Sequence, residues 1–131
     1  MNWKPAVLAS AACLLLAAAP MHAHHSFAAE YDKAKPLKLT GTVTKFDLTN
    51  PHSWIYIDVV GEDGKVTNWG FETASPSNLY RRGFRKDTVK TGMKVTIEGF
   101  QAKDDTHTGN AQRLTMPDGM QFIMGTEENP G

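Results

Sequence analysis

Three histidines give this sequence its clearest prospect of chemistry. His24 and His25 are adjacent, and His52 stands in the segment Asn50-Pro51-His52. If the mature chain begins at His24, the free α-amine and the imidazole Nδ1 of that residue can chelate Cu(II) in a six-membered ring. His52 would add a third nitrogen, and amine and imidazole nitrogens suit Cu(II). We therefore expect copper as a cofactor, bound by His24 and His52 with help from His25. The alternative is a solvated arm whose histidines bind nothing.

The Asn50-Pro51-His52 corner is the second feature that could carry function. A proline restricts the residue before it to extended geometry, so Pro51 fixes the direction in which His52 leaves the chain. His52 could then serve as a metal ligand, as a general base, or only as a cap for backbone groups in a turn. A hydrolase or isomerase would need a carboxylate or hydroxyl partner beside His52, and the sequence identifies none. We favour a binding protein over an enzyme.

A binding module without a metal is the competing hypothesis. Trp54, Tyr56 and Trp69 would line a face of the domain that holds a small molecule, a glycan or a protein partner of the periplasm. Arg81 and Arg82 would add a preference for anions. Such cations at a helix end are commonly a solvated group that complements the helix dipole.

Methionines offer a further source of ligands. Thioethers bind Cu(I), and Met116 and Met120 are expected to face each other across a hairpin loop, with Met124 nearby in the sequence. Methionine is also an adaptable filler of small cores. We favour the core interpretation for these three residues.

The first 23 residues have the pattern of a secretory signal peptide. Lys4 precedes an apolar run at 6–19, and the small residue Ala23 stands before the expected cleavage point. The run is shorter than the roughly 20 residues that span a bilayer, and we expect no stable membrane span after signal removal. The predicted compartment is the periplasm. The only cysteine, Cys13, lies inside the signal, so the mature chain would contain no thiol.

Composition narrows the classes of partner. The 131 residues predict one domain. The chain has 14 basic and 14 acidic residues, so it has no basic excess with which to hold nucleic acid. We therefore expect a metal ion, a small-molecule ligand or a periplasmic protein as the partner, and no nucleic acid.

Residue patterns predict an all-β domain between an arm at 24–36 and a flexible tail at 126–131. Leu37, Leu39, Gly41 and Val43 alternate with polar residues, which is typical of a half-buried strand, and a bulge near Lys45 would explain the later change of phase. The expected strands are 37–47, 53–60, 65–72, 93–101, 111–116 and 120–124, with a short helix opened by Ser75-Pro76. This order, within 37–125, matches an OB-like β-barrel of five to six strands with a helix between the third and fourth; a β-sandwich is the alternative.

Several of these segments together resemble a known family. They are His24-His-Ser-Phe-Ala-Ala-Glu-Tyr-Asp32, Asn50-Pro-His-Ser-Trp-Ile-Tyr56, Trp69-Gly-Phe-Glu72 and Ser75-Pro-Ser-Asn-Leu-Tyr-Arg-Arg-Gly83. The chain is similar to the small exported bacterial proteins of the DUF6152 family over essentially the whole expected mature chain. The resemblance implies that His24, His25 and His52 belong to the family pattern. It implies no established activity.

Overall fold

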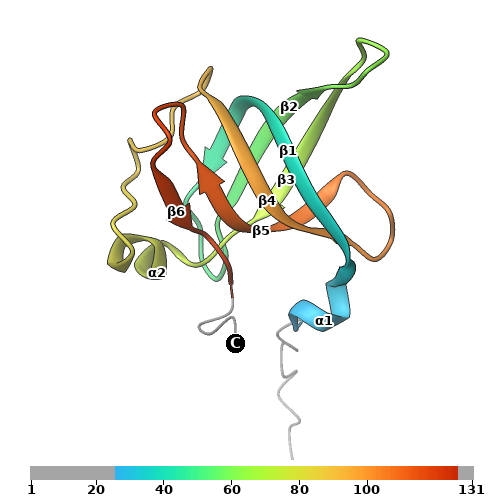
Figure 1. Cartoon of the computed structure of the whole chain (residues 1–131). Helices are drawn as coiled ribbons and strands as arrows, with labels where there is room; N and C mark the ends of the chain where they lie inside the picture. Colours follow the sequence, from blue (N-terminus) through green and yellow to red (C-terminus); the bar gives the residue numbers. More distant parts are fainter. Residues whose placement is uncertain (1–25, 127–131) are drawn as a thin grey trace, which may run out of the picture.

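Alternating apolar and polar residues form six strands, which give the protein a mainly β fold. The computed structural model describes residues 26–126. Two short helices accompany the strands (Figure 1). In chain order the elements are α1 (Phe27–Glu30), β1 (Tyr31–Asp47), β2 (Trp54–Val60), β3 (Val66–Glu72), α2 (Pro76–Arg81), β4 (Lys94–Ala102), β5 (Thr108–Thr115) and β6 (Gln121–Ile123).

The six strands pair in the order β3-β2-β1-β4-β5-β6, and every neighbouring pair in this order is antiparallel. In addition, β3 pairs with β5 in parallel over residues 70–72 and 108–110. Following the pairings from β3 through β2, β1, β4 and β5 therefore leads back to β3, so that these five strands form a ring of pairings. Figure 1 shows β1 and β4 crossing in front of β2 and β3. The short β6 extends the sheet beyond this ring.

The long strand β1 changes partners near its middle. Its first part pairs with β4 up to Thr42, and its second part pairs with β2 from Thr42 onward. Gly41 lies at this transition, where a Cβ atom would stand 2.4 Å from the Asp58 backbone oxygen. Only glycine permits this close approach of β1 to β2. The expected bulge near Lys45 is present as a register shift between Val43 and Lys45.

The main core lies between the strands and α2. Phe122 of β6 packs against this core and is partly buried. The buried members come from β1 to β5, from the segment 74–89 and from Met124; they are Val43, Ile55, Ile57, Phe71, Ala74, Leu79, Phe84, Val89, Val95, Ile97, Ala111, Leu114 and Met124. The α2 helix begins as its sequence predicts, with the Ser75 hydroxyl accepting from the Asn78 N–H at 3.3 Å and Pro76 in the first turn. Gly83 follows α2 with φ +89°.

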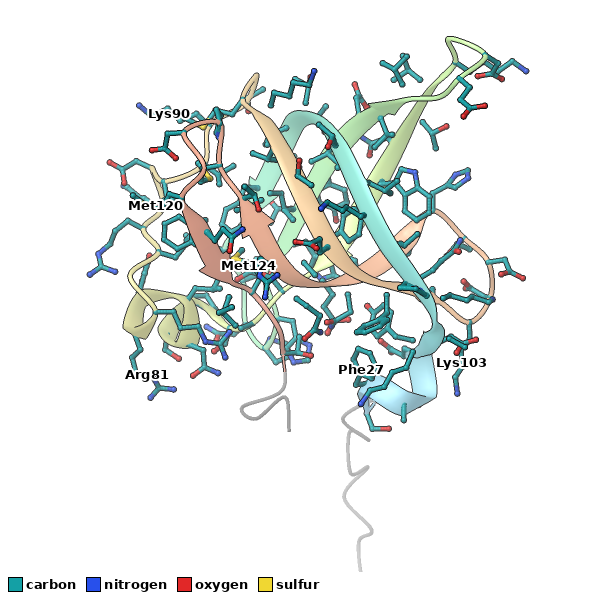
Figure 2. All side chains as sticks on the ribbon, in the orientation of Figure 1. Phe27, Arg81, Lys90, Lys103, Met120 and Met124 are labelled. Atoms are coloured by element: carbon teal, nitrogen blue, oxygen red, sulfur yellow. The ribbon has the colours of Figure 1, made fainter. Side chains whose placement is uncertain are left out.

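A second, smaller core holds the start of the described chain against β4. Phe27, Tyr31 and Ala102 are buried together, and Phe100 packs against them. The Phe27 and Tyr31 rings lie 5.5 Å apart, as residues four positions apart on a helical turn can. The Lys103 N–H also donates to the Glu30 carbonyl oxygen at 2.9 Å. Figure 2 shows Phe27 and Lys103 close to α1.

This packing accounts for the main difference from the expected secondary structure. Residues 27–30, expected to be extended, form α1, and β1 begins at Tyr31 rather than Leu37. The helical turn allows both aromatic rings to be buried in the second core. The predicted signal peptide, His24, His25 and the tail residues 127–131 lie outside the described residues. Within residues 26–126, no helix is long and apolar enough to cross a membrane.

Candidate functional site

The corner that carries His52 is held by backbone hydrogen bonds to the segment that follows β3. The Ser53 N–H donates to the Ala74 carbonyl oxygen at 3.2 Å, and the Thr73 N–H donates to the Ser53 carbonyl oxygen at 2.8 Å. The Thr49 hydroxyl donates to the His52 carbonyl oxygen at 2.9 Å. Ser53 and Thr73 are fully buried. The backbone on the C-terminal side of His52 is therefore fixed, while its imidazole remains one-third exposed.

Glu72, the last residue of β3, provides the imidazole with a carboxylate partner. Its Oε1 atom lies 2.5 Å from His52 Nδ1, and its side chain is only 8% exposed. Its other oxygen, Oε2, accepts a hydrogen bond from the Tyr31 hydroxyl. One buried carboxylate thus joins the Asn50-Pro51-His52 corner to the first residue of β1.

The protons in this network can be assigned from the chemistry of its members. Burial, followed by the hydrogen bond to Glu72 and its negative charge, raises the pKa of Tyr31 far above its ordinary value of 10.0. The Tyr31 hydroxyl therefore stays protonated and is the donor in its hydrogen bond to Glu72. An ionised carboxylate only accepts, so His52 Nδ1 carries a hydrogen in its contact with Glu72. The Nε2 atom is then the nitrogen that can coordinate a metal ion or accept a proton.

A cavity of about 470 Å³ adjoins this network. Tyr31 and Trp54 contribute to its wall, and Trp54 is the residue that pairs with Glu72 across β2 and β3. The other lining residues come from α1 and from the segment at the β4–β5 turn: Ala29, Glu30, Ala102, Lys103, Asp104, Thr106 and Thr108. The cavity therefore combines an indole, two threonine hydroxyls and charged groups.

The three aromatic residues of the alternative hypothesis do not share one face. Trp54 and Tyr56 alternate with the buried Ile55 and Ile57, and their rings stack at 6.3 Å with an angle of 22° between planes. Trp69 pairs with Ile57 and therefore lies on the opposite face of the sheet. There it stacks on Phe71 and contacts the His107 ring at 5.1 Å. A ligand on the outer face would meet Trp54 and Tyr56 only.

The two candidate arginines both bond to groups of the protein itself. Arg82 donates to the carbonyl oxygens of Ile123 and Gly125 at 3.3 and 2.9 Å. This ties α2 to the segment around β6. Arg81 donates to the Asn78 side chain one turn earlier. Both contacts are structural, and they leave only part of each guanidinium for an anion.

Among the residues that the structure describes, no group of three or more His, Cys, Asp or Glu side chains could hold a metal ion. A three-nitrogen copper site would therefore need His24 or His25, which precede the described part. Within that part, only His52 of the three predicted ligands can be placed, and it has a carboxylate partner.

Sequence reasoning missed Glu72 as a partner of His52. The expected strands 53–60 and 65–72 would place Val60 opposite Lys65 and Trp54 opposite Phe71, whereas the structure pairs Val60 with Val66 and Trp54 with Glu72. A slip of one residue turns every side chain of a strand to the other face, so the contact of Glu72 with His52 depends on a register that the expected strand ends miss by one residue. No signal was available for Tyr31, because its position depends on how β1 crosses to β4 and on the packing of α1.

Comparison with known proteins identifies one family. A family model described as a family of unknown function, DUF6152, matches residues 11–112. The match includes the three predicted histidine ligands, Tyr31 and Glu72. Among curated proteins, none matches the chain.

Proposed function

Because the chain belongs to the DUF6152 family, for which no function is described, its role must be argued from its own residues, and we propose that it is a periplasmic copper-binding module. The ligand nitrogens in this proposal come from His52 and from the His24-His25 terminus. Export by a cleaved signal peptide is part of the proposal, because cleavage before His24 creates the amine ligand. The protein would bind or deliver the metal rather than catalyse a reaction.

The observation that carries the proposal is the contact between His52 Nδ1 and Glu72 Oε1 at 2.5 Å. Histidines that bind metals commonly donate their other ring N–H to a carboxylate, which fixes the tautomer and raises the basicity of the ligating nitrogen. Glu72 supplies this carboxylate, and it is itself buried. His52 Nε2 is thus oriented before any metal arrives.

The second support comes from the beginning of the described chain. Tyr31 donates to the same carboxylate, and Phe27 is buried beside Tyr31. His25 is only two residues before Phe27, a span of at most about 7 Å. The second core therefore fixes the point from which the two N-terminal histidines extend, and Tyr31 links that point to Glu72.

A small OB-like barrel is the scaffold that we propose for this site. The return of the pairings from β5 to β3 and the position of α2 between β3 and β4 support it. Such a closed arrangement would hold the His52 corner rigidly, as precise positioning of a ligand requires.

Copper titration of the exported, processed protein tests the proposal. The N-terminal residue is first established by mass spectrometry, and Cu(II) is then added while EPR spectra are recorded. We expect one equivalent to bind with nitrogen hyperfine structure, and His52→Ala to weaken binding by about tenfold or more. His107→Ala is the matched control, because His107 contacts Trp69 and not Glu72. The proposal would be rejected if copper bound weakly and if neither His52→Ala nor His107→Ala changed the affinity.

A non-metal binding module remains a second candidate, and the cavity beside Trp54 favours it. Its ligand would be a small molecule, a glycan or part of a protein that packs on the indole and bonds to the polar lining. The histidine arm discriminates the two functions. Replacing His24 and His25 by alanine should abolish copper binding, whereas a ligand of the cavity should bind that variant as it binds the original chain.

A further inference from the structure

We propose that Met93, Met116 and Met120 form a separate site for a soft monovalent metal ion, Cu(I) or Ag(I). All three line one cavity of about 350 Å³. Figure 2 places Met120 on the side of the molecule away from Phe27, and hence away from the second core. None of these methionines belongs to the His52–Glu72 network, so the inference does not rest on the proposed function.

Two separate segments bring the methionines together. Met93 directly precedes β4, whereas Met116 and Met120 lie at the two ends of the turn between β5 and β6. The Met116 N–H donates to the Met120 carbonyl oxygen at 2.8 Å, and Gly119 with φ +87° completes the tight turn between them. This turn keeps two of the thioethers on neighbouring strand ends. The remaining lining residues are Thr88, Pro117, Asp118 and Phe122.

The Met93 side chain is positioned by a contact with the backbone three residues earlier. The backbone N–H of Lys90 donates to the Met93 sulfur at 3.4 Å. This contact uses one lone pair of the thioether and leaves the other for a metal ion. Figure 2 shows Lys90 and Met120 on the same side of the molecule.

Core filling does not account for the whole group. Met124 is fully buried in the main core, whereas Met120 is 56% exposed. A side chain with that exposure contributes little to a core, yet it borders a cavity that two other thioethers also line. Soft thioether ligands select Cu(I) over hard cations. Asp118, whose carboxylate accepts from the Met120 N–H at 2.9 Å, adds a negative charge that favours a cation there.

Silver provides the test, because Ag(I) has the softness of Cu(I) and does not change oxidation state. The full processed protein is labelled with [methyl-13C]methionine, the methyl resonances are assigned with single Met→Leu variants, and silver nitrate is added. His24, His25, His52 and His107, the four histidines of the expected mature chain, are replaced by alanine in the background, so that imidazoles cannot compete. Leucine has nearly the volume of methionine and should preserve the packing, which a thermal unfolding curve checks for each variant.

We expect the methyl signals of Met93, Met116 and Met120 to move together and to saturate at one equivalent of Ag(I). The Met124 signal should stay in place, which makes it the internal control. Met116→Leu and Met120→Leu should each weaken binding by about tenfold, and Met124→Leu should leave it unchanged. The proposal is overturned if only the exposed Met120 responds, or if the variant with all three methionines replaced binds Ag(I) as tightly as the parent.

Discussion

Replacing Glu72 by glutamine would test whether one carboxylate unites the His52 corner with the start of β1. The substitution keeps the size of the side chain and removes its charge and one of its two acceptor oxygens. Tyr31 and His52 both donate to this carboxylate. A glutamine can accept from one of them with its oxygen, but it turns an NH₂ group toward the other donor.

The expected cost follows from the loss of one such bond. A hydrogen bond to a charged group contributes about 1.5–3 kcal/mol, and a buried donor without a partner loses its interaction with water as well. Removing the buried charge offsets part of this, because a carboxylate that is only 8% exposed has been largely desolvated. We expect the free energy of unfolding to fall by about 2 kcal/mol, equivalent to about 10 °C in melting temperature for a domain of this size.

Denaturant unfolding measures this change, with Glu98→Gln as the control. Glu98 pairs with Lys38 and Arg113 at 3.9 and 3.6 Å on a more exposed surface, where such pairs contribute at most about 1 kcal/mol. Hydrogen exchange should accelerate at α1 in Glu72→Gln and remain unchanged in Glu98→Gln. Nitrogen NMR should report loss of the Nδ1–H tautomer preference of His52. If Glu72→Gln is no less stable than Glu98→Gln and exchange at α1 is unaltered, the shared carboxylate does not link the two segments.

Two further predictions concern Tyr31 and Gly99. The pKa of Tyr31 is raised in the folded state, so its hydrogen bond to Glu72 stabilises the fold fully below pH 10.0, and this stabilisation falls as the pH rises above that value. The original protein and Tyr31→Phe differ in their free energy of unfolding, and this difference should shrink by about 1.4 kcal/mol between pH 9 and pH 11. Denaturant titrations at the two pH values measure it. A gap that is constant or grows with pH would contradict the assignment of the proton to Tyr31. A Cβ at Gly99 would stand 1.9 Å from the Asn110 backbone oxygen, so Gly99→Ala should lower the free energy of unfolding by about 2 kcal/mol or more. Gly61→Ala, whose nearest contact is the flexible Asp63 side chain, is its control, and equal stability of the two variants would show that β4 and β5 can separate there at little cost.

Local patterns in the sequence predicted the elements well, because most of them depend on near neighbours. Alternation indicated the strands, Ser75-Pro76 indicated the start of α2, and the hairpin loop expected between Met116 and Met120 is present, with Gly119 in the left-handed region. The mainly β class and the membership of DUF6152 are confirmed. Helix α1 was missed, since its four residues are helical only because Phe27 and Tyr31 are buried against β4.

The site was less predictable, since its parts come from distant segments. His52 was recognised from its proline corner, but the sequence showed no partner for it. Glu72 is 20 positions away and Tyr31 is 41 positions from Glu72. The first contact depends on the exact register of the β2–β3 hairpin, which the expected strand ends at Val60 and Lys65 miss by one residue. The second depends on the path of β1 from β4 to β2, and no residue pattern within β1 specifies where its first residue will lie.

The shared carboxylate also bears on how a metal site could be assembled from an N-terminal arm and a rigid corner. A ligand that bridges two segments must overcome the conformational entropy of ordering them, and prior fixing of either segment reduces that cost. In this protein the corner is fixed by hydrogen bonds at Ser53 and Thr73, and the arm is fixed as far as Phe27 and Tyr31. The proposed ligands His24 and His25 lie within three residues of Phe27 in the sequence, so the segment that a metal ion would have to bridge to the corner is short. The same argument gives Tyr31 a measurable role in copper binding: Tyr31→Phe should weaken affinity less than His52→Ala does, because it releases the arm without removing a ligand.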